Sequence, residues 1–108
     1  MVRINADKIT DFQTFHTVFA EAFGFPDFYG KNMNAWIDCL TYLDEPDAEM
    51  STVHVLSGQS LTLVIDNAKS FKERCPDIFM ALVECSAFVN WRRIEVGNSS
   101  VLALGFFS

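Results

Sequence analysis

The sequence has no long run of apolar residues. Its longest uninterrupted apolar stretch, residues 101–107, contains seven residues including a glycine, whereas a membrane span requires roughly 18 or more. The N-terminus also lacks the basic start and the apolar block of about 7 to 15 residues that mark a secretory signal, because Arg3 and Asn5 stand around single apolar residues. We therefore expect no transmembrane helix, no membrane partner and a cytoplasmic location.

Basic residues are also scarce. Lys and Arg number 8 against 14 Asp and Glu, which gives a net charge of -6 at pH 7. This charge is repelled by phosphodiester backbones and by anionic lipid surfaces, so we expect no nucleic-acid ligand. An acidic surface favours a basic protein partner, although solubility alone explains the charge of most small acidic proteins.

Residues that carry catalytic or metal chemistry are few. Cys39, Cys75 and Cys85 are odd in number and show no CxxC spacing, which is typical of reduced thiols and not of a disulfide framework or a zinc site. The five glycines form no nucleotide-binding pattern. We expect no metal, no cofactor, no small-molecule substrate and no catalytic residue. A small enzyme would have to use His16 or His54, placed in a pocket beside a carboxylate or a thiol.

Apolar residues are abundant, at 50% of the 108 residues, which is enough to build the core of a single domain over residues 1–108. Residues 2–5 alternate between apolar and polar, which predicts a short strand. From Asp11 onward, phenylalanines recur at spacings of 3, 4 and 4, which predicts a helix that Gly24 ends. We expect the resulting stripe to belong to the core and not to a ligand-stacking surface; its members are Phe12, Phe15, Phe19 and Phe23.

An aromatic loop and an acidic helix come next. Pro26 and Gly30 interrupt the helical period and predict a structured loop over residues 25–30. Asn32 is a favourable N-cap, and an apolar stripe from Met33 to Leu43 predicts a second helix. At 100° per residue its opposite face, expected to be polar, acidic and exposed, carries Asn34, Asp38, Thr41 and Glu45, with Tyr42 at its edge.

Acidic residues are concentrated around this helix. Four carboxylates stand within residues 44–49 and repel one another, which predicts a solvated loop. Residues 27–49 together hold six acidic residues and one basic residue, Lys31, a local charge of -5. Most of the net charge of the chain therefore falls in this segment.

The second half of the sequence predicts further strands and helices. Residues 52–56 fit a short strand or a loop edge, and residues 61–65 have the continuous apolar character of a buried central strand. Residues 69–74 look helical, and Pro76 opens another helix that runs to about Trp91. Its predicted inward stripe is Ile78, Leu82, Cys85 and Val89, its outward face includes Glu84, and Arg92 and Arg93 suit its C-terminal dipole. Residues 101–107 predict a closing strand.

Helices of this length between apolar strands require crossover connections. The predicted fold class is therefore α/β, a small and mostly parallel sheet with helices packed on it. No repeat and no low-complexity tract is present.

The segment from Phe25 to Thr41 resembles the barstar family, small cytoplasmic inhibitors of secreted bacterial ribonucleases such as barnase. The shared pattern is a proline, an acid, two aromatic residues, a glycine, any residue and an asparagine, followed by a helix carrying Asp-Cys-Leu-Thr. The predicted order of strands and helices is similar to that of the family over most of the chain. Residues 44–60 and 90–100 are unlike it.

The resemblance implies a barstar-like fold with a three-stranded parallel sheet, and a binding function without catalysis. In this family the second helix and the loop before it block the active site of the nuclease. The implied partner is a basic protein, a ribonuclease, and Asp38 aligns with the aspartate that mimics a phosphate. Gly30 and Thr41 match flanking contact positions, and Glu84 matches a glutamate on a later helix.

The chain departs from the family pattern at the expected partner-binding residues. Phe28 stands in place of a contacting tyrosine, so a hydroxyl is lost, and Asn34 replaces a contacting aspartate, so a charge is lost. One residue of the pair Phe28 and Tyr29 is expected to close the edge of the core. The complete predicted binding set is Phe28, Tyr29, Gly30, Asn34, Asp38, Thr41, Tyr42 and Glu84. These departures leave open an interaction or regulatory module with a partner that is not a nuclease.

Overall fold

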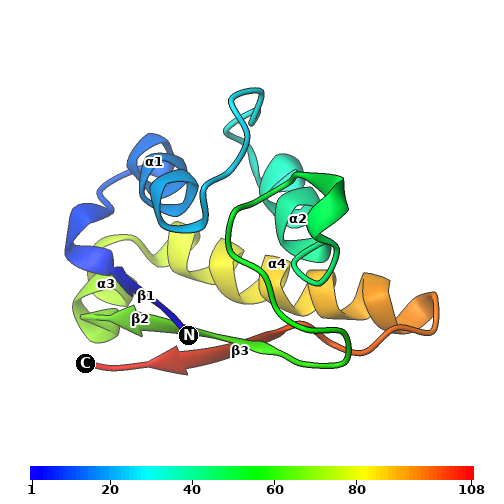
Figure 1. Cartoon of the computed structure of the whole chain (residues 1–108). Helices are drawn as coiled ribbons and strands as arrows, with labels where there is room; N and C mark the ends of the chain where they lie inside the picture. Colours follow the sequence, from blue (N-terminus) through cyan, green and yellow to red (C-terminus); the bar gives the residue numbers. More distant parts are fainter.

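The computed structural model describes all 108 residues. Three strands, four α-helices and two short 3-10 helices follow one another along the chain (Figure 1). Their bounds are β1 Val2–Asn5, a 3-10 turn Ala6–Lys8, α1 Phe12–Phe23, α2 Met33–Thr41, a 3-10 turn Pro46–Ala48, β2 Leu61–Asp66, α3 Ala68–Arg74, α4 Pro76–Glu95 and β3 Leu102–Phe106. The predicted α/β class is confirmed.

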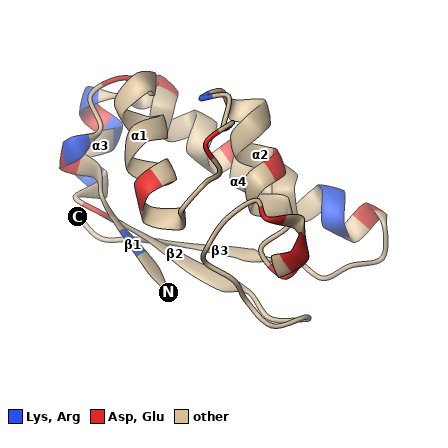
Figure 2. Cartoon of the chain, turned by 45° about the horizontal axis from the view of Figure 1, so that its top comes forward, with Lys and Arg blue, Asp and Glu red and all other residues tan.

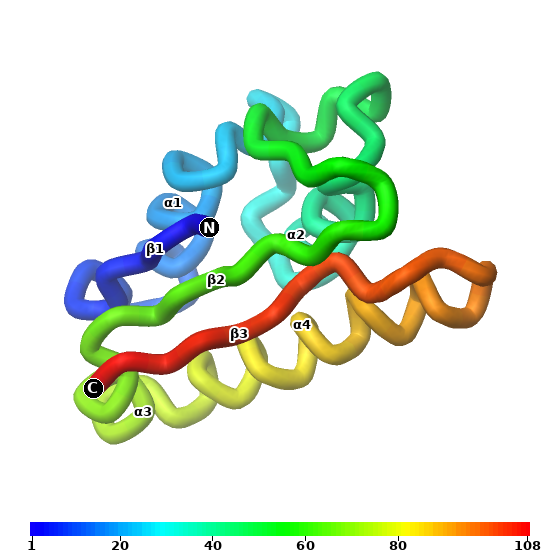
Figure 3. Tube along the Cα trace, turned by 60° about the horizontal axis from the view of Figure 1, so that its bottom comes forward, coloured from blue at the N-terminus to red at the C-terminus, as the bar shows by residue number.

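The three strands form one parallel sheet in the order β1-β2-β3, with β2 in the middle. Ile65 of β2 pairs with Ile4 of β1 and with Phe106 of β3. β2 is the central strand, as its continuous apolar run predicted, because both of its edges are paired and Leu61, Leu63, Val64 and Ile65 are all buried. α1 and α2 lie on one side of the sheet, and the view from the other side shows the strands in front (Figure 3).

The core lies between the sheet and the helices, and aromatic rings fill much of it. Phe15, Phe19 and Phe23 on α1 are fully buried, and the Phe19 ring centroid lies 5.6 Å from that of Trp36 on α2. Burying each such ring stabilises the fold by roughly 1.5 to 3 kcal/mol. Phe12 departs from the prediction, since 42% of its surface is exposed. It is the first residue of the helix, where the stripe extends beyond the elements that cover the later rings.

Helix α4 runs along the β3 side of the sheet (Figures 1 and 3). It extends to Glu95, beyond the predicted end near Trp91. Ile78, Leu82 and Val89 are buried as predicted, Cys85 is partly buried against the core, and Ser86 and Arg93 are buried as well. Ser86 and Cys85 lie at similar angles on either side of the inward line, and packing against neighbouring elements selects Ser86.

No strand forms at residues 52–56, which cross the molecule as an irregular segment. Thr52 N–H donates to the carbonyl of Phe23 at 2.8 Å, and Val55 N–H donates to the carbonyl of Leu43 at 3.0 Å. The backbone bonds of this segment therefore go to helix ends and not to the sheet. None of the helices combines the length and the apolar character needed to cross a membrane.

Candidate protein-binding site

The loop between α1 and α2 carries three of the predicted binding residues, and aromatic packing holds it on the core. Gly24 ends α1 in the left-handed region (φ 65°), and a Cβ there would lie 2.0 Å from Thr52 Oγ1, so only glycine fits. Phe25 lies against Phe23 with ring centroids 5.7 Å apart. The Tyr29 ring lies 4.7 Å from that of Phe25. The base of the loop is therefore part of the hydrophobic core.

Tyr29 is fastened to α1 by a polar contact as well. Its hydroxyl and His16 Nδ1 are hydrogen-bonded at 2.5 Å. Burial lowers the pKa of His16, and nearby Lys31 lowers it further; burial also raises the pKa of the Tyr29 hydroxyl. Both groups are thus neutral at pH 7. The hydrogen-bond partner of His16 is the Tyr29 hydroxyl, and not the carboxylate or thiol that the catalytic hypothesis required.

The tip of the loop projects from the molecule beyond α1 and α2 (the cyan segment of Figure 1). Phe28 is 77% exposed, so Tyr29 is the residue of the pair that closes the core's edge. Gly30 is exposed, and Lys31 has a φ of 50°, in the left-handed region that side chains rarely adopt. Asn32 then caps α2, with its Oδ1 accepting from Ala35 N–H at 2.8 Å. The loop enters the helix in one fixed geometry.

Helix α2 exposes two of the predicted contact residues. Asn34 and Asp38 lie one turn apart and are both exposed, while Trp36, Cys39 and Leu40 are buried on the other side. Burial, reinforced by the adjacent Asp38, raises the pKa of the Cys39 thiol to about 11. This thiol is therefore protonated at neutral pH, and the polar surface of α2 consists of an amide and a carboxylate.

The predicted polar face is wrong at its C-terminal end. Helix α2 ends at Thr41, so Glu45 lies beyond it in the following turn. Thr41 is buried, and its hydroxyl donates to the carbonyl of Ile37 at 2.6 Å. Tyr42 caps the helix and is partly buried. The helical projection took no account of α4, which packs against α2 and whose Arg93 donates a hydrogen bond to the Thr41 carbonyl.

A buried ion pair joins the end of α2 to α4, and the sequence did not reveal it. Arg93 retains 4% of its side-chain exposure and contacts both carboxylate oxygens of Asp44, at 2.9 Å and 2.6 Å. Its Nη1 also donates to the Thr41 carbonyl, and its Nε donates to that of Ser99, both at 2.7 Å. The hydrogen bonds from Arg93 lower the pKa of Asp44. The sequence predicted a solvated Asp44 and an Arg93 that interacts with the C-terminal dipole of the helix. The structure instead pairs the two side chains in the interior.

A second, exposed ion pair involves the main candidate residue. Arg92 Nη1 donates to Asp38 Oδ1 at 2.9 Å, linking α4 to the exposed side of α2. Sequence spacing contained no signal for this contact, because the two residues are 54 positions apart. Glu84 is exposed on α4 as expected and forms no ion pair. The structure thus brings Asp38 beside α4.

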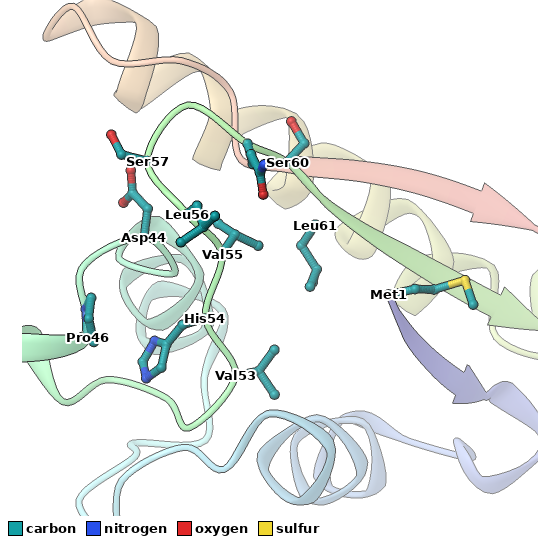
Figure 4. Close-up of a pocket in the computed structure, with 11 residues that line it drawn as sticks. Met1, Asp44, Pro46, Val53, His54, Val55, Leu56, Ser57, Ser60 and Leu61 are labelled. Carbon is teal, nitrogen blue, oxygen red and sulfur yellow. The ribbon is translucent and has the colours of Figure 1, made fainter.

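A surface groove of about 530 Å³ lies between the segment 53–61, Met1 and the turn after α2 (Figure 4). His54 and Asp44 both line it, but Figure 4 shows their side chains apart, and no hydrogen bond joins them. The Asp44 carboxylate is occupied by Arg93. His54 therefore lacks the partnered carboxylate that a catalytic histidine would require.

Asp38 is the acidic residue of α2, further acidic residues gather on the segment after it, and basic residues lie on α3 and near the end of α4 (Figure 2). No group of three or more His, Cys, Asp or Glu side chains is arranged to hold a metal ion. What this surface offers chemically is a carboxylate with an open side, a neighbouring amide and a projecting phenyl ring.

Comparison with known families agrees with this geometry. The model of the family described as Barstar (barnase inhibitor) matches residues 1–101 of the chain. No curated protein matches it. The matched residues include β1, α1, the projecting loop, α2, β2, α3 and α4. With its three-stranded parallel sheet and the loop and helix that precede the acidic turn, the chain belongs to the barstar family.

Proposed function

We propose that this protein inhibits a ribonuclease by inserting α2 and the preceding loop into the active site of the enzyme. The observation that carries the proposal is the placement of Asp38. In a chain of the barnase-inhibitor family, its carboxylate is exposed on α2, one turn after Asn34 and on the helix that follows the projecting loop. A nuclease site that binds phosphate accepts a carboxylate in its place, because both are anions that arginine and lysine recognise.

The charge distribution supports a fast encounter with such a partner. Residues 27–49 carry a local charge of -5, and a field of this sign attracts a basic active site from a distance. The steered association of barnase with barstar is itself the reference case for this effect. Phe28, at 77% exposure on the loop before α2, adds exposed apolar area that a partner can cover, as expected at the centre of an interface.

Inhibition of barnase by increasing amounts of the protein tests the proposal directly. Asp38→Ala should weaken inhibition by about 2 to 5 kcal/mol, because the basic group of the enzyme would be left buried and unpaired. The fold should change little, since the exposed pair with Arg92 contributes roughly 0.2 to 1 kcal/mol and alanine is the better helix former. Asp66→Ala is the matched control, because it also breaks one partly exposed Arg–Asp pair, on the sheet.

The association rate provides a second measurement. It should fall as salt rises from about 0.05 to 0.5 M, because the Debye length shrinks below the encounter distance. Equal inhibition by Asp38→Ala and the parent protein, or a rate that ignores salt, would contradict the proposed mode of binding.

A second function is an interaction or regulatory module with a partner that is not a nuclease. Two features favour it: Phe28 lacks a hydroxyl, and Asn34 carries no charge. Affinity capture from the native cell, followed by a ribonuclease assay of the captured protein, separates the two functions. A captured partner without nuclease activity that still requires Asp38 would favour the module.

A further inference from the structure

The ion pair between Arg92 and Asp38 leaves half of the carboxylate open. Arg92 Nη1 contacts Oδ1 at 2.9 Å, and Oδ2 accepts no hydrogen bond within the chain. The side chains of Asp38 and Arg92 are 51% and 36% exposed. A basic group from another protein can therefore reach Oδ2 while Arg92 still holds Oδ1.

The surroundings make this pair part of a surface that a partner would cover. Phe88 lies one turn before Arg92 on α4 and is 45% exposed, and the adjacent Trp91 is 56% exposed. Exposed aromatic side chains of this kind become buried when proteins associate, and they remove water from neighbouring charges. Arg92 and an incoming cation would then meet at one carboxylate with little water between them.

We propose that Arg92 is a specificity-determining residue that competes with the basic group of the partner for Asp38. This inference rests on the proposed function, because it assumes that Asp38 binds a basic group. Two positive charges on one carboxylate repel each other, and the repulsion grows as water is excluded. Arg92 thus weakens the binding of a basic group at Asp38, so a partner needs further contacts on this surface to bind tightly.

Arg92→Gln tests the competition, since glutamine keeps a polar side chain and removes the charge. Arg3→Gln is the matched control. Arg3 is also partly exposed and also pairs with an aspartate, Asp66, at 2.6 Å, and its loss changes the net charge by the same amount. Arg3 lies on β1, in the sheet, and not on α2 or α4.

The probe is a fluorescein-labelled hexa-arginine peptide, and its affinity is measured by fluorescence anisotropy at low salt. Arg92→Gln should bind the peptide about 3- to 10-fold more tightly than Arg3→Gln, because only Arg92 competes at Asp38. In an Asp38→Asn background the two arginine variants should bind alike. Equal affinities of Arg92→Gln and Arg3→Gln in the parent background, or an advantage of Arg92→Gln that persists in Asp38→Asn, would overturn the inference.

The barnase assay separates this inference from the proposed function. A parent protein that inhibits neither barnase nor a ribonuclease activity in its captured partner contradicts the proposed function, while the peptide still decides whether Arg92 competes at Asp38. Inhibition that depends on Asp38, together with equal peptide binding by the two arginine variants, overturns only the role of Arg92.

Discussion

Replacing Asp44 with alanine should strongly destabilise the protein, because it removes the only carboxylate that faces the buried Arg93. The guanidinium retains 4% exposure and donates four hydrogen bonds, two of them to Asp44. The other two reach the carbonyls of Thr41 and Ser99. Asp44→Ala leaves a buried cation with two carbonyl contacts and no counter-charge.

The expected cost follows from this burial. Removing one partner of a buried ion pair costs about 3 to 5 kcal/mol. The Asp44 side chain retains 12% exposure, so some water reaches the cation, and we expect a value of about 3 kcal/mol. This would lower the midpoint of thermal unfolding by about 10 to 20 °C in a domain of this size.

Urea unfolding at pH 7, followed by circular dichroism, measures the difference in the free energy of unfolding. Asp66→Ala is the control, since it breaks the Arg3 pair, whose side chains are 51% and 30% exposed; it should cost about 0.2 to 1 kcal/mol. Asp44→Asn keeps the shape and one acceptor, and it should fall between the two. Were Asp44→Ala no more costly than Asp66→Ala, the Arg93 network would not be what holds the end of α2 to α4.

Three further outcomes are expected. The stability advantage of the parent over Asp44→Asn should be fully present above about pH 4, the ordinary pKa of an aspartate, and should disappear as pH falls through the lowered folded-state pKa of Asp44; urea titrations from pH 7 to pH 2 would show this, and a constant difference would refute it. Phe19→Ala should cost about 3 to 5 kcal/mol, because its ring is fully buried; a fully stable variant that had lost only partner binding would show that the phenylalanine stripe recognises a ligand. Thermal unfolding should be unchanged by a reductant or a chelator, because the three cysteines are unpaired and no metal cluster exists; a drop of many degrees with either reagent would contradict this.

Periodicity predicted most of the fold because burial repeats along the chain in step with local geometry. The rings of Phe15, Phe19 and Phe23 face the core because spacings of four residues keep them on one side of a helix. The central position of β2 followed from its continuous apolar run, since a strand paired on both edges and covered by helices has few exposed positions.

Periodicity failed where a helix ends or meets another helix. Phe12 continues the stripe in sequence but is 42% exposed, and Thr41 lies on the polar side in projection but is buried. A helical projection contains no information about which neighbour covers a given turn. For the same reason the projection did not predict the burial of Ser86 on α4.

For the candidate site, the sequence by itself predicted the structured loop, the Asn32 cap, the helix that follows and the exposed Asp38, because all of these depend on residues close together in the chain. Only the tertiary structure decided which charged side chains pair with one another. Arg92 meets Asp38 across 54 residues, and Arg93 meets Asp44 across 49. Local propensity cannot specify such pairs, since they form only when the packing of α2 against α4 brings two distant turns within 3 Å.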